Sequence, residues 1–401
     1  MKKHLSLAVI LTFILALVSV IYSVNHNSKI ANKPEPVITE SVSATEDEAQ
    51  MRGLWVSYIS LDMSDTDFSE NAFREKFGEI IKTAKEYRCN ALFVHTRAFC
   101  DAFYKSEIFP SSHILWGEQG YEESYDALEI MCSLCEKENI ELHAWVNPYR
   151  VKSKGANFEL SSHNPYVLDK SLGVEYDGGI YLNPAKKEVR NLILNGVLEI
   201  IENYNINGIH FDDYFYPTND ESFDKAEYNQ YLKACKSESD AMPLNEWRKQ
   251  NVNMLIAEIY RKIKETNPSI SYGISPQGNI QNDFEMGADV KSWTENIGYA
   301  DYICPQLYYS IENPALKFEA GLDSWLSFNR HENLKLYAGL AVYKAGTDSD
   351  NGTWLLNNDI LATELKIINN KGLDGYILYD YEALISEKAK EEMSAFKESL
   401  D

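Results

Sequence analysis

Apolar runs alternate with amphipathic stretches along the chain from residue 51 onward. Eight short runs are rich in β-branched, aromatic and other apolar residues, as buried strands are. They cover residues 52–61, 91–97, 140–150, 208–217, 270–279, 301–310, 335–346 and 374–384. Between them, apolar residues recur at helical spacing over residues 72–87, 125–137, 186–204, 244–267, 314–328, 357–371 and 386–399. Strands that alternate with helices pair in parallel, and eight such units predict a closed (β/α)8 TIM barrel of the α/β class.

An open, doubly wound sheet is the alternative architecture for this alternation. That fold usually carries a G-x-G-x-x-G phosphate loop after its first strand, and no such loop follows residues 52–61. The connections after the second, third and fourth predicted strands are long, at about 98–121, 151–183 and 214–243. Because active sites of barrels form on the loops at the carboxyl ends of the strands, we expect these long loops to build walls around that face.

The amino-terminal residues carry a targeting signal. Lys2 and Lys3 precede an uncharged run from Leu5 to Val24, which is about as long as a bilayer span. Basic residues before the run would hold the amino end inside the cell. Residues 1–24 are therefore predicted to be a signal peptide or a signal anchor, and the rest of the chain to be extracytoplasmic, either membrane-anchored or secreted. Residues 25–50 read as a flexible linker, which leaves residues 51–401 for the barrel domain.

Charge and the missing motifs narrow the class of function. The formal net charge of -23 argues against nucleic acid as a partner, since nucleic-acid binding needs clustered Lys and Arg. No H-E-x-x-H, G-x-S-x-G or Walker motif is present. Six cysteines follow no framework spacing, and the C-x-x-C of Cys132 and Cys135 has no second pair or His cluster nearby. The sequence thus predicts neither a metal nor another cofactor.

The stretch GIHFDDYFYP at residues 208–217 offers the clearest candidate chemistry. Asp212 and Asp213 directly follow the apolar residues of the fourth predicted strand, and Pro217 prevents that strand from continuing. Two adjacent carboxylates in a partly apolar setting cannot both ionise easily, so the pKa of one should rise. Such a carboxyl can donate a proton near neutral pH, which makes the pair a catalytic candidate. The alternative is a solvated Asp-Asp turn.

Several other strands end in polar or aromatic side chains, which a barrel would gather around one mouth. Side-chain alternation places His143, Trp145 and Asn147 on one face of their strand, and His210 on the same face as Asp212. The long loops also contribute aromatic rings that suit the apolar faces of sugars, namely Tyr104, Trp116, Tyr149, Tyr214 and Tyr216. The predicted substrate-binding residues are Arg97, His143, Trp145, Asn147, His210, Tyr214, Gln306, Tyr308 and Asp380.

Several motifs resemble a known family. RGLWVS (52–57), LHAWVNPYRV (142–151), GIHFDDYFYP (208–217), GISPQG (273–278) and PQLYYS (305–310) are similar to the glycosyl-hydrolase-like family 10, with the likeness spanning about residues 51–385. This resemblance implies an exported bacterial barrel with glycoside hydrolase activity. It further implies bacterial cell-wall glycan as the polysaccharide substrate, particularly peptidoglycan strands stripped of peptide.

Two further classes of function remain open at this point. A non-catalytic carbohydrate-binding or cell-wall-binding barrel is the main alternative, and a polysaccharide deacetylase fits less well because the metal-ligand spacing is missing.

Adjacent aspartates look like the pair of some substrate-assisted hexosaminidases. In that scheme Asp212 orients the acetamido group of the sugar and Asp213 acts as the acid, with Asp380 and Glu382 as substitutes. The oligomeric state is left open.

Overall fold

The computed structural model describes residues 50–400 of the 401-residue chain. The predicted signal segment at residues 1–24 and the predicted linker up to residue 49 lie outside this range. Among residues 50–400, no helix combines the length and hydropathy that a bilayer span requires. The structure therefore concerns the predicted barrel domain.

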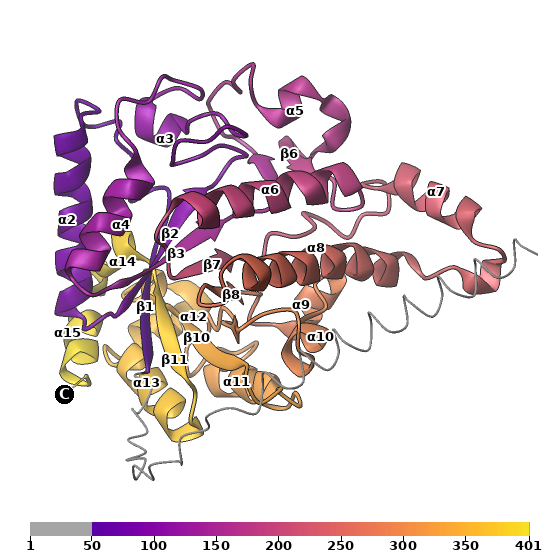
Figure 1. The fold of residues 1–401 in the computed structure, drawn as a ribbon. Coiled ribbons are helices and arrows are strands. Elements are labelled where there is room, and N and C mark those ends of the chain that lie inside the picture. The colour runs from indigo at the N-terminus through magenta and orange to yellow at the C-terminus, as the bar shows by residue number, and fades with distance from the viewer. Residues whose placement is uncertain (1–49, 401) are drawn as a thin grey trace, which may run out of the picture. The chain divides into compact units, whose positions relative to one another are not determined.

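Within the described range, eight parallel strands close into a barrel, which confirms the predicted TIM-barrel fold (Figure 1). Closure is made by the first strand, which pairs with both the second and the last. Most of the predictions extended past the observed carboxyl end of the strand, because aromatic loop residues continue the apolar run. The strands are β1 (Met51–Val56), β2 (Ala91–Arg97), β3 (Glu141–Val146), β7 (Gly208–Phe211), β8 (Ser271–Ile274), β9 (Tyr302–Ile303), β10 (Lys335–Ala341) and β11 (Gly375–Tyr379).

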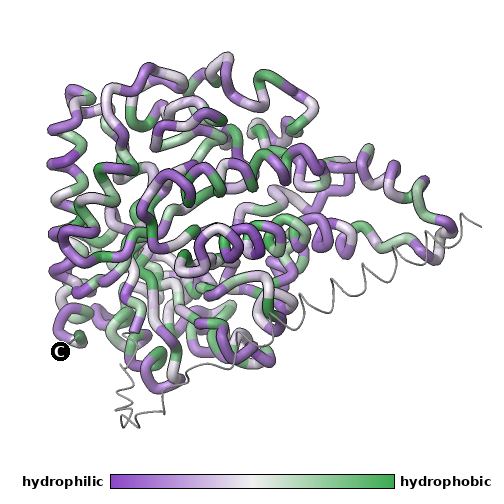
Figure 2. The backbone as a smooth tube through the Cα atoms, viewed as in Figure 1, coloured by the Kyte–Doolittle hydropathy of each residue, from purple (hydrophilic) through white to green (hydrophobic). Residues whose placement is uncertain are grey.

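The helices around the barrel follow the predicted periodicity. Along them, hydrophilic residues alternate with apolar ones (Figure 2), as helices between a barrel and solvent require. Local signals set their ends: Ser69 accepts the Ala72 N–H to begin one helix, and Gly372, at φ 69°, ends another. The predicted helices are α2 (Glu70–Glu86), α4 (Ala127–Lys137), α6 (Lys187–Asn203), α8 (Leu244–Thr266), α11 (Phe318–Leu326), α13 (Ile360–Lys371) and α15 (Lys390–Glu398).

The long loops contain structure that the sequence pattern does not predict. The loop after β3 holds a small antiparallel sheet of β4 (Arg150–Lys152), β5 (Gly173–Tyr176) and β6 (Gly179–Leu182). Helix α7 (Lys225–Ala234), which has no buried residue, extends away from the barrel at the right of Figure 1. The remaining helices are α3 (His113–Trp116), α5 (Pro165–Leu168), α9 (Ile280–Glu285), α10 (Val290–Glu295), α12 (Ser349–Gly352) and α14 (Tyr381–Leu384).

The inside of the barrel is filled by large aromatic side chains that face glycines. A Cβ on Gly273 would lie 1.9 Å from the ring of Tyr302, and a Cβ on Gly208 would lie 2.2 Å from Nδ1 of His143. Neighbouring strands thus alternate large and small residues across the interior, as a packed barrel core requires. The interior is solid, so a substrate can reach the barrel only at its mouth.

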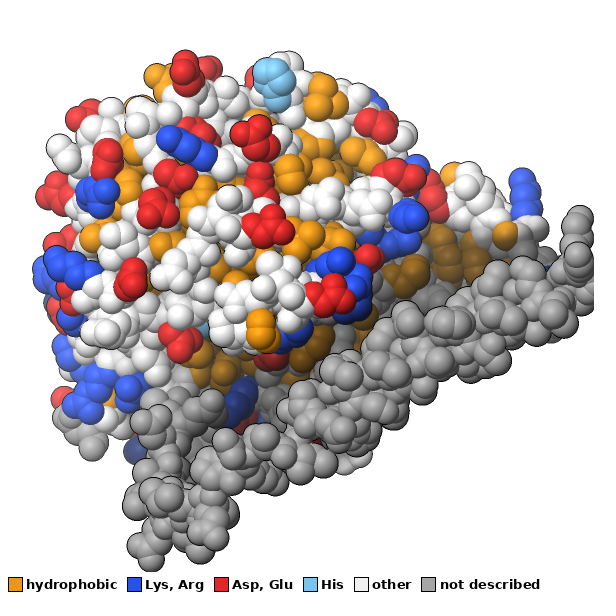
Figure 3. Space-filling view, in the orientation of Figure 1, with side chains coloured by type: hydrophobic (Ala, Val, Ile, Leu, Met, Phe, Trp, Pro, Cys, Tyr) orange, Lys and Arg blue, Asp and Glu red, His pale blue; other side chains and the backbone are white. Residues whose placement is uncertain are grey.

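The outer surface carries charges of both signs. On the face shown in Figure 3, acidic and basic side chains are interspersed among apolar and neutral ones. That face thus shows no basic stripe of the kind that nucleic acid binding needs.

Candidate active site

The two adjacent aspartates lie at the carboxyl end of β7, where the active sites of barrels form. Asp212 follows the last strand residue directly and is 3% exposed, while Asp213 is partly exposed. The alternation of β7 places Asp212 on the inner side of the barrel, two residues after His210. The pair therefore presents one buried and one accessible carboxyl to the mouth.

Three N–H groups hold the carboxyl of Asp212. Trp145 donates from Nε1 to Oδ2 over 3.0 Å, and Asn147 donates from Nδ2 to the same oxygen. The backbone N–H of Tyr214 donates to Oδ1 over 3.2 Å. Donors on both oxygens fix the orientation of this carboxyl and stabilise its ionised form.

Asn147 is oriented by its own neighbours. The backbone N–H of Tyr58 donates to Nδ1 of His95 over 3.1 Å, so the neutral imidazole must carry its proton on Nε2. That Nε2 lies 3.1 Å from Oδ1 of Asn147 and donates to it, as does Nη2 of Arg150. Burial, aided by Arg150, holds the pKa of His95 well below its usual range. With two donors on Oδ1, the amide nitrogen of Asn147 is the atom that faces Asp212.

Asp213 has fewer partners. Gln306 donates from Nε2 to Oδ1 over 3.0 Å, and the same nitrogen lies 3.1 Å from the Ser275 carbonyl oxygen. Within residues 50–400, no other residue donates a hydrogen bond to Oδ2 of Asp213. This oxygen is consequently available to a substrate.

The electrostatics of the pair follow from its burial. Burial, with the charge of Asp213 added, raises the pKa of Asp212 to about 7, against the opposing effects of Arg150 and Trp145. Burial also raises the pKa of Asp213, which the hydrogen bond from Gln306 opposes. Since adjacent carboxyls titrate as a unit, the pair keeps a shared proton at a higher pH than an isolated Asp would.

Asp380 lies at the same mouth but does not touch the pair. Its Oδ2 accepts a hydrogen bond from Ser57 over 3.1 Å, and its Oδ1 accepts the Ala383 N–H, which begins α14. Burial raises the pKa of this carboxyl too. Asp380 thus links the ends of β11 and β1. In the closed strand order β11 lies opposite β7, so Asp380 borders the mouth on the side opposite the aspartate pair.

Arg97 lies away from the other predicted residues, and its assignment to substrate contacts is corrected. Its side chain is 1% exposed and its guanidinium carbon lies 4.6 Å from the centroid of the Phe109 ring. A Cβ on Gly196 of α6 would be 2.6 Å from its Nη1. The physical reason is the irregular register between His95 and Arg97, which turns Arg97 outward to the helix layer.

His143 and His210 also lie deeper than predicted, in the packed interior. Trp55 Nε1 donates to Nε2 of His210 over 3.0 Å, so Nδ1 of His210 donates to the Tyr302 hydroxyl at 3.1 Å. The hydroxyl then donates to Nδ1 of His143 over 3.3 Å. His143 completes the chain with a 3.2 Å contact from Nε2 to Glu141. Both histidines are committed to this internal chain, which corrects their assignment to substrate binding.

Two of the aromatic residues predicted to bind substrate expose their rings to solvent, at least in part. Tyr214 is 50% exposed, and Tyr308 is partly exposed with ring centroids 5.6 Å from Tyr343 and 5.5 Å from Tyr379. These rings are the surfaces available to a sugar. The other four loop aromatics proposed as platforms are buried, because they pack the loops onto the barrel: Tyr104, Trp116, Tyr149 and Tyr216.

Arg150 is the last residue of the third predicted strand and lies at the site, although it is not among the predicted substrate-binding residues. It begins β4, three positions after Asn147, and contacts that residue through Nη2. Its charge opposes the rise in the pKa values of Asp212 and Asp213. The available signal was its position at the end of NPYR, three residues after the candidate Asn147.

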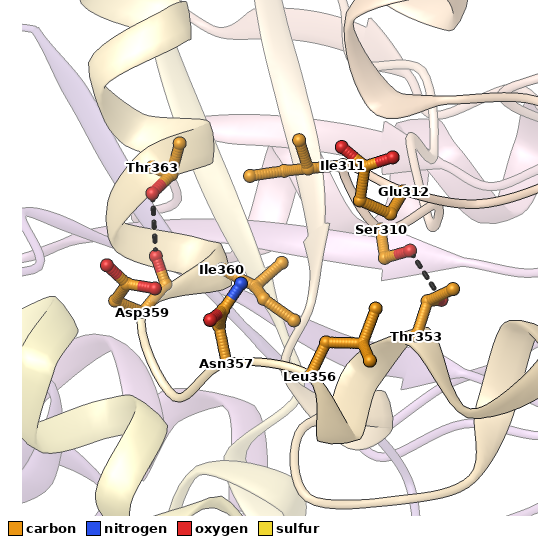
Figure 4. Close-up of a pocket in the computed structure, with 9 residues that line it drawn as sticks. All are labelled: Ser310, Ile311, Glu312, Thr353, Leu356, Asn357, Asp359, Ile360 and Thr363. Atoms are coloured by element: carbon orange, nitrogen blue, oxygen red, sulfur yellow. Dashed lines mark hydrogen bonds between the residues drawn. The ribbon is translucent and has the colours of Figure 1, made fainter.

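Two other features are separate from this site. A cavity of about 320 Å³ lies between the loop after β9 and the start of α13, where Ser310 and Thr353 hydroxyls are 2.6 Å apart (Figure 4). None of its lining residues belongs to the predicted site. Across residues 50–400, no group of three or more His, Cys, Asp or Glu side chains is placed to hold a metal ion, and Cys132 and Cys135 are buried free thiols.

Solved structures that resemble the protein share its fold. The glycoside hydrolase domain of PgaB (BpsB) from Bordetella bronchiseptica superposes with a TM-score of 0.58, at 12% identity, over 86% of this chain and 99% of that domain. The alpha-L-fucosidase isoenzyme 2 from Paenibacillus thiaminolyticus gives a TM-score of 0.52 at 11% identity, over 87% of this chain and 49% of that one. At these identities the likeness concerns the barrel fold alone.

Sequence comparisons identify the family. Glycosyl hydrolase YngK of Bacillus subtilis (strain 168) is 31% identical over 327 residues, which are 76% of this chain and 63% of that protein. Glycosyl hydrolase DigH of Escherichia coli (strain K12) is 27% identical over 406 aligned residues, covering 90% of this chain and 91% of that protein. The model of the family described as glycosyl hydrolase-like 10 matches residues 50–355. The resemblance drawn from the motifs is thereby confirmed, and the chain belongs to the glycosyl hydrolase-like 10 family.

Proposed function

We propose that this protein is an extracytoplasmic glycoside hydrolase that cleaves N-acetylated glycan of the bacterial cell wall, with peptide-free peptidoglycan strands as its substrate. The observation that carries the proposal is that two adjacent carboxyls at the barrel mouth differ in how many hydrogen-bond donors they have. Asp212 has donors on both oxygens, whereas Asp213 has an oxygen that no other described residue engages. The carboxyl of Asp212 is therefore held in one orientation, whereas Asp213 has an oxygen that can exchange a proton with a substrate.

Adjacency of the two carboxyls favours substrate assistance as the mechanism. Glycosidases with an acid and a separate nucleophile or base usually hold these carboxyls about 5–5.5 Å or 6.5–9.5 Å apart, on either side of the scissile bond. Consecutive residues at one strand end do not readily flank a bond in this way. The acetamido oxygen of the sugar would then serve as the nucleophile, on the face of the anomeric carbon opposite the leaving oxygen. Asp212 would contact the acetamido group and Asp213 the leaving oxygen.

In this mechanism the acetamido oxygen bonds to the anomeric carbon as the glycosidic bond breaks, and the bonding pair leaves with the departing oxygen. The proton that the pair shares passes to that oxygen from Oδ2 of Asp213, which leaves Asp212 ionised. Asp212 accepts the acetamido N–H and stabilises the positive charge that develops on the group. Water then attacks the anomeric carbon, and the bond between that carbon and the acetamido oxygen breaks with its electron pair returning to the acetamido group. The water gives up a proton to Asp213, which restores the enzyme.

The substrate class is supported by the family and by the predicted export of the chain. The curated relatives are named glycosyl hydrolases. The exposed ring of Tyr214 and the partly exposed ring of Tyr308 offer flat faces against which sugar rings can pack. A barrel that binds carbohydrate without cleaving it is the competing function, and it would share these aromatic surfaces.

Mass spectrometry of products separates the two functions. The full chain is incubated with intact peptidoglycan and with peptidoglycan freed of peptide by an amidase, beside Asp212→Asn and the exposed control Asp177→Asn. We expect soluble oligosaccharides from the peptide-free strands with the wild type and the control, and a loss of product with Asp212→Asn. Binding to the strands without any soluble product would establish the non-catalytic barrel instead.

Export is tested independently of catalysis. The basic residues Lys2 and Lys3 before the uncharged run support an extracytoplasmic barrel. An alkaline phosphatase fused after residue 60 should be active, since that enzyme functions outside the cytoplasm. Activity of only a cytoplasmic reporter at the same position would place the barrel inside the cell.

A further inference from the structure

Arg150 lies beside the carboxyl pair with most of its hydrogen-bonding capacity unused. Its Nε donates to the Ala98 carbonyl oxygen over 2.9 Å, and its Nη2 donates to Asn147. A guanidinium has five N–H donors, and the part of the chain that the structure describes supplies no further hydrogen-bond partner for Arg150. Three donors thus remain for a ligand.

Aromatic rings surround this cation. The guanidinium carbon lies 4.7 Å from the ring centroid of Phe99, 5.2 Å from that of Tyr214 and 5.6 Å from that of Tyr58. These rings stabilise the positive charge through their π faces, but they do not use the N–H donors as an oxygen anion would. The exposed ring of Tyr214 places the cluster at the open mouth.

The charge of Arg150 is not neutralised by a direct ion pair. Although its field lowers the pKa values of Asp212 and Asp213, Arg150 forms no ion pair with either of them or with any other carboxylate in residues 50–400. Arg150 is also only 9% exposed, so water satisfies little of the guanidinium. A buried cation with free donors and no counter-ion is a binding site for an anion.

We infer that Arg150 binds a carboxylate of the substrate, and specifically the free lactyl carboxylate of an N-acetylmuramic acid residue; this inference rests on the proposed function. In peptide-bearing strands the same carboxyl group is an amide and carries no charge. It becomes an anion once the peptide is removed. The planar guanidinium matches a carboxylate in a bidentate geometry, so Arg150 distinguishes stripped strands from intact ones.

The neighbouring carboxyls allow this binding. Asp212, Asp213 and Asp380 would repel an incoming anion if all three were ionised. Burial raises the pKa of each of them, which reduces their combined negative charge near neutral pH.

The test uses one glycan backbone in two forms. Peptide-free strands are compared with the same strands after carbodiimide coupling of the lactyl carboxyl to methylamine, which removes its charge. For the wild type we expect kcat/KM to favour the acid form by about 10-fold or more, the range of a hydrogen-bonded charged group. Arg150→Met should bring this ratio close to 1, Arg150→Lys should give an intermediate ratio, and the exposed control Arg74→Met should keep the wild-type ratio.

A role limited to positioning Asn147 predicts a different result. Arg150→Met would then slow both glycans by the same factor and leave the ratio unchanged, which would overturn the inference. A wild-type ratio near 1 would overturn it without any variant, should Arg150→Met fail to fold. If no glycan is cleaved, the proposed function fails, but the ratio of dissociation constants for the two glycans still tests Arg150 in the same way.

Discussion

The side-chain amide of Gln306 donates from Nε2 to Oδ1 of Asp213 over 3.0 Å. This bond reaches across the barrel mouth from the end of β9 to the end of β7, over 93 positions of sequence. It stabilises the ionised form of Asp213 and so lowers its pKa against the effect of burial. Gln306 therefore adjusts the acidity of the carboxyl that we assign as the acid.

Removal of Gln306 should move the pH dependence of activity. Asp213 acts in its protonated form, so the rate falls as pH rises through the upper apparent pKa of the pair. Without the amide donor the ionised form is less stable and that pKa rises. We expect the basic limb of the kcat profile of Gln306→Ala to shift upward by about one pH unit, since a hydrogen bond to a charged group contributes about 1.5–3 kcal/mol. The exposed control Gln281→Ala should keep the wild-type limb, and a downward shift would contradict the assignment.

Loss of the acid should depend on the leaving group. Asp213→Asn cannot protonate the departing oxygen, which costs about 10² to 10⁴ in rate. A glycan, whose leaving oxygen is strongly basic, should show this full loss in kcat/KM. With a nitrophenyl glycoside of N-acetylglucosamine, the nitrophenolate leaves without needing a proton. For this substrate kcat/KM of Asp213→Asn should stay close to the wild-type value, and the basic limb of the pH profile should disappear. Equal losses on both substrates would remove Asp213 from the acid role, and Asp177→Asn provides the matched control.

The buried Asp212 should lower stability at high pH. Its folded pKa of about 7 lies above the ordinary value, so the stability present at low pH is lost as pH rises from about 4 to 7. Asp212→Asn lacks this ionisation. The difference in Tm between Asp212→Asn and the wild type should thus become more positive between pH 4.5 and pH 8, by on the order of 2 °C or more. A constant difference would show that this carboxyl does not titrate in that window.

The strand-helix pattern was sufficient for the architecture because each strand and helix carries its own periodicity. It also predicted that Asn147 and Asp212 lie at the carboxyl ends of their strands, and both follow directly after a buried strand. The alternation of side chains along a strand predicts whether a residue faces inward or outward, but it does not predict how deep in the barrel that residue lies. His143 faces inward as predicted, but its register partner is Gly208, the first residue of β7, whereas Asp212 lies beyond the last. It is therefore too far from the mouth to meet a substrate.

The positions of Arg97 and Arg150 depend on local irregularities of the backbone, which a periodic sequence pattern cannot predict. The register shift after His95 turns Arg97 to the helix layer. Arg150 lies at the site because a bend at residues 148–149 follows Asn147 and leads into the separate sheet of β4, β5 and β6. Aromatic loop residues were equally ambiguous, since a ring that packs a loop and a ring that binds a sugar have the same residue type.

The last prediction concerns the glycines inside the barrel. A Cβ on Gly273 would lie 1.9 Å from the Tyr302 ring, which cannot move aside because its hydroxyl bonds both His210 and His143. Gly273→Ala should thus destabilise the barrel by about 1–3 kcal/mol or more through overpacking. Gly78 lies in the middle of α2, and apart from its chain neighbours and the nearby backbone of the helix itself, no atom lies within 4 Å of the position that an alanine methyl group would take there. Gly78→Ala should instead stabilise the protein by about 0.5–1 kcal/mol through helix propensity. Thermal unfolding of the two variants measures the contrast, and a Tm for Gly273→Ala equal to that of the wild type would show that the interior can yield.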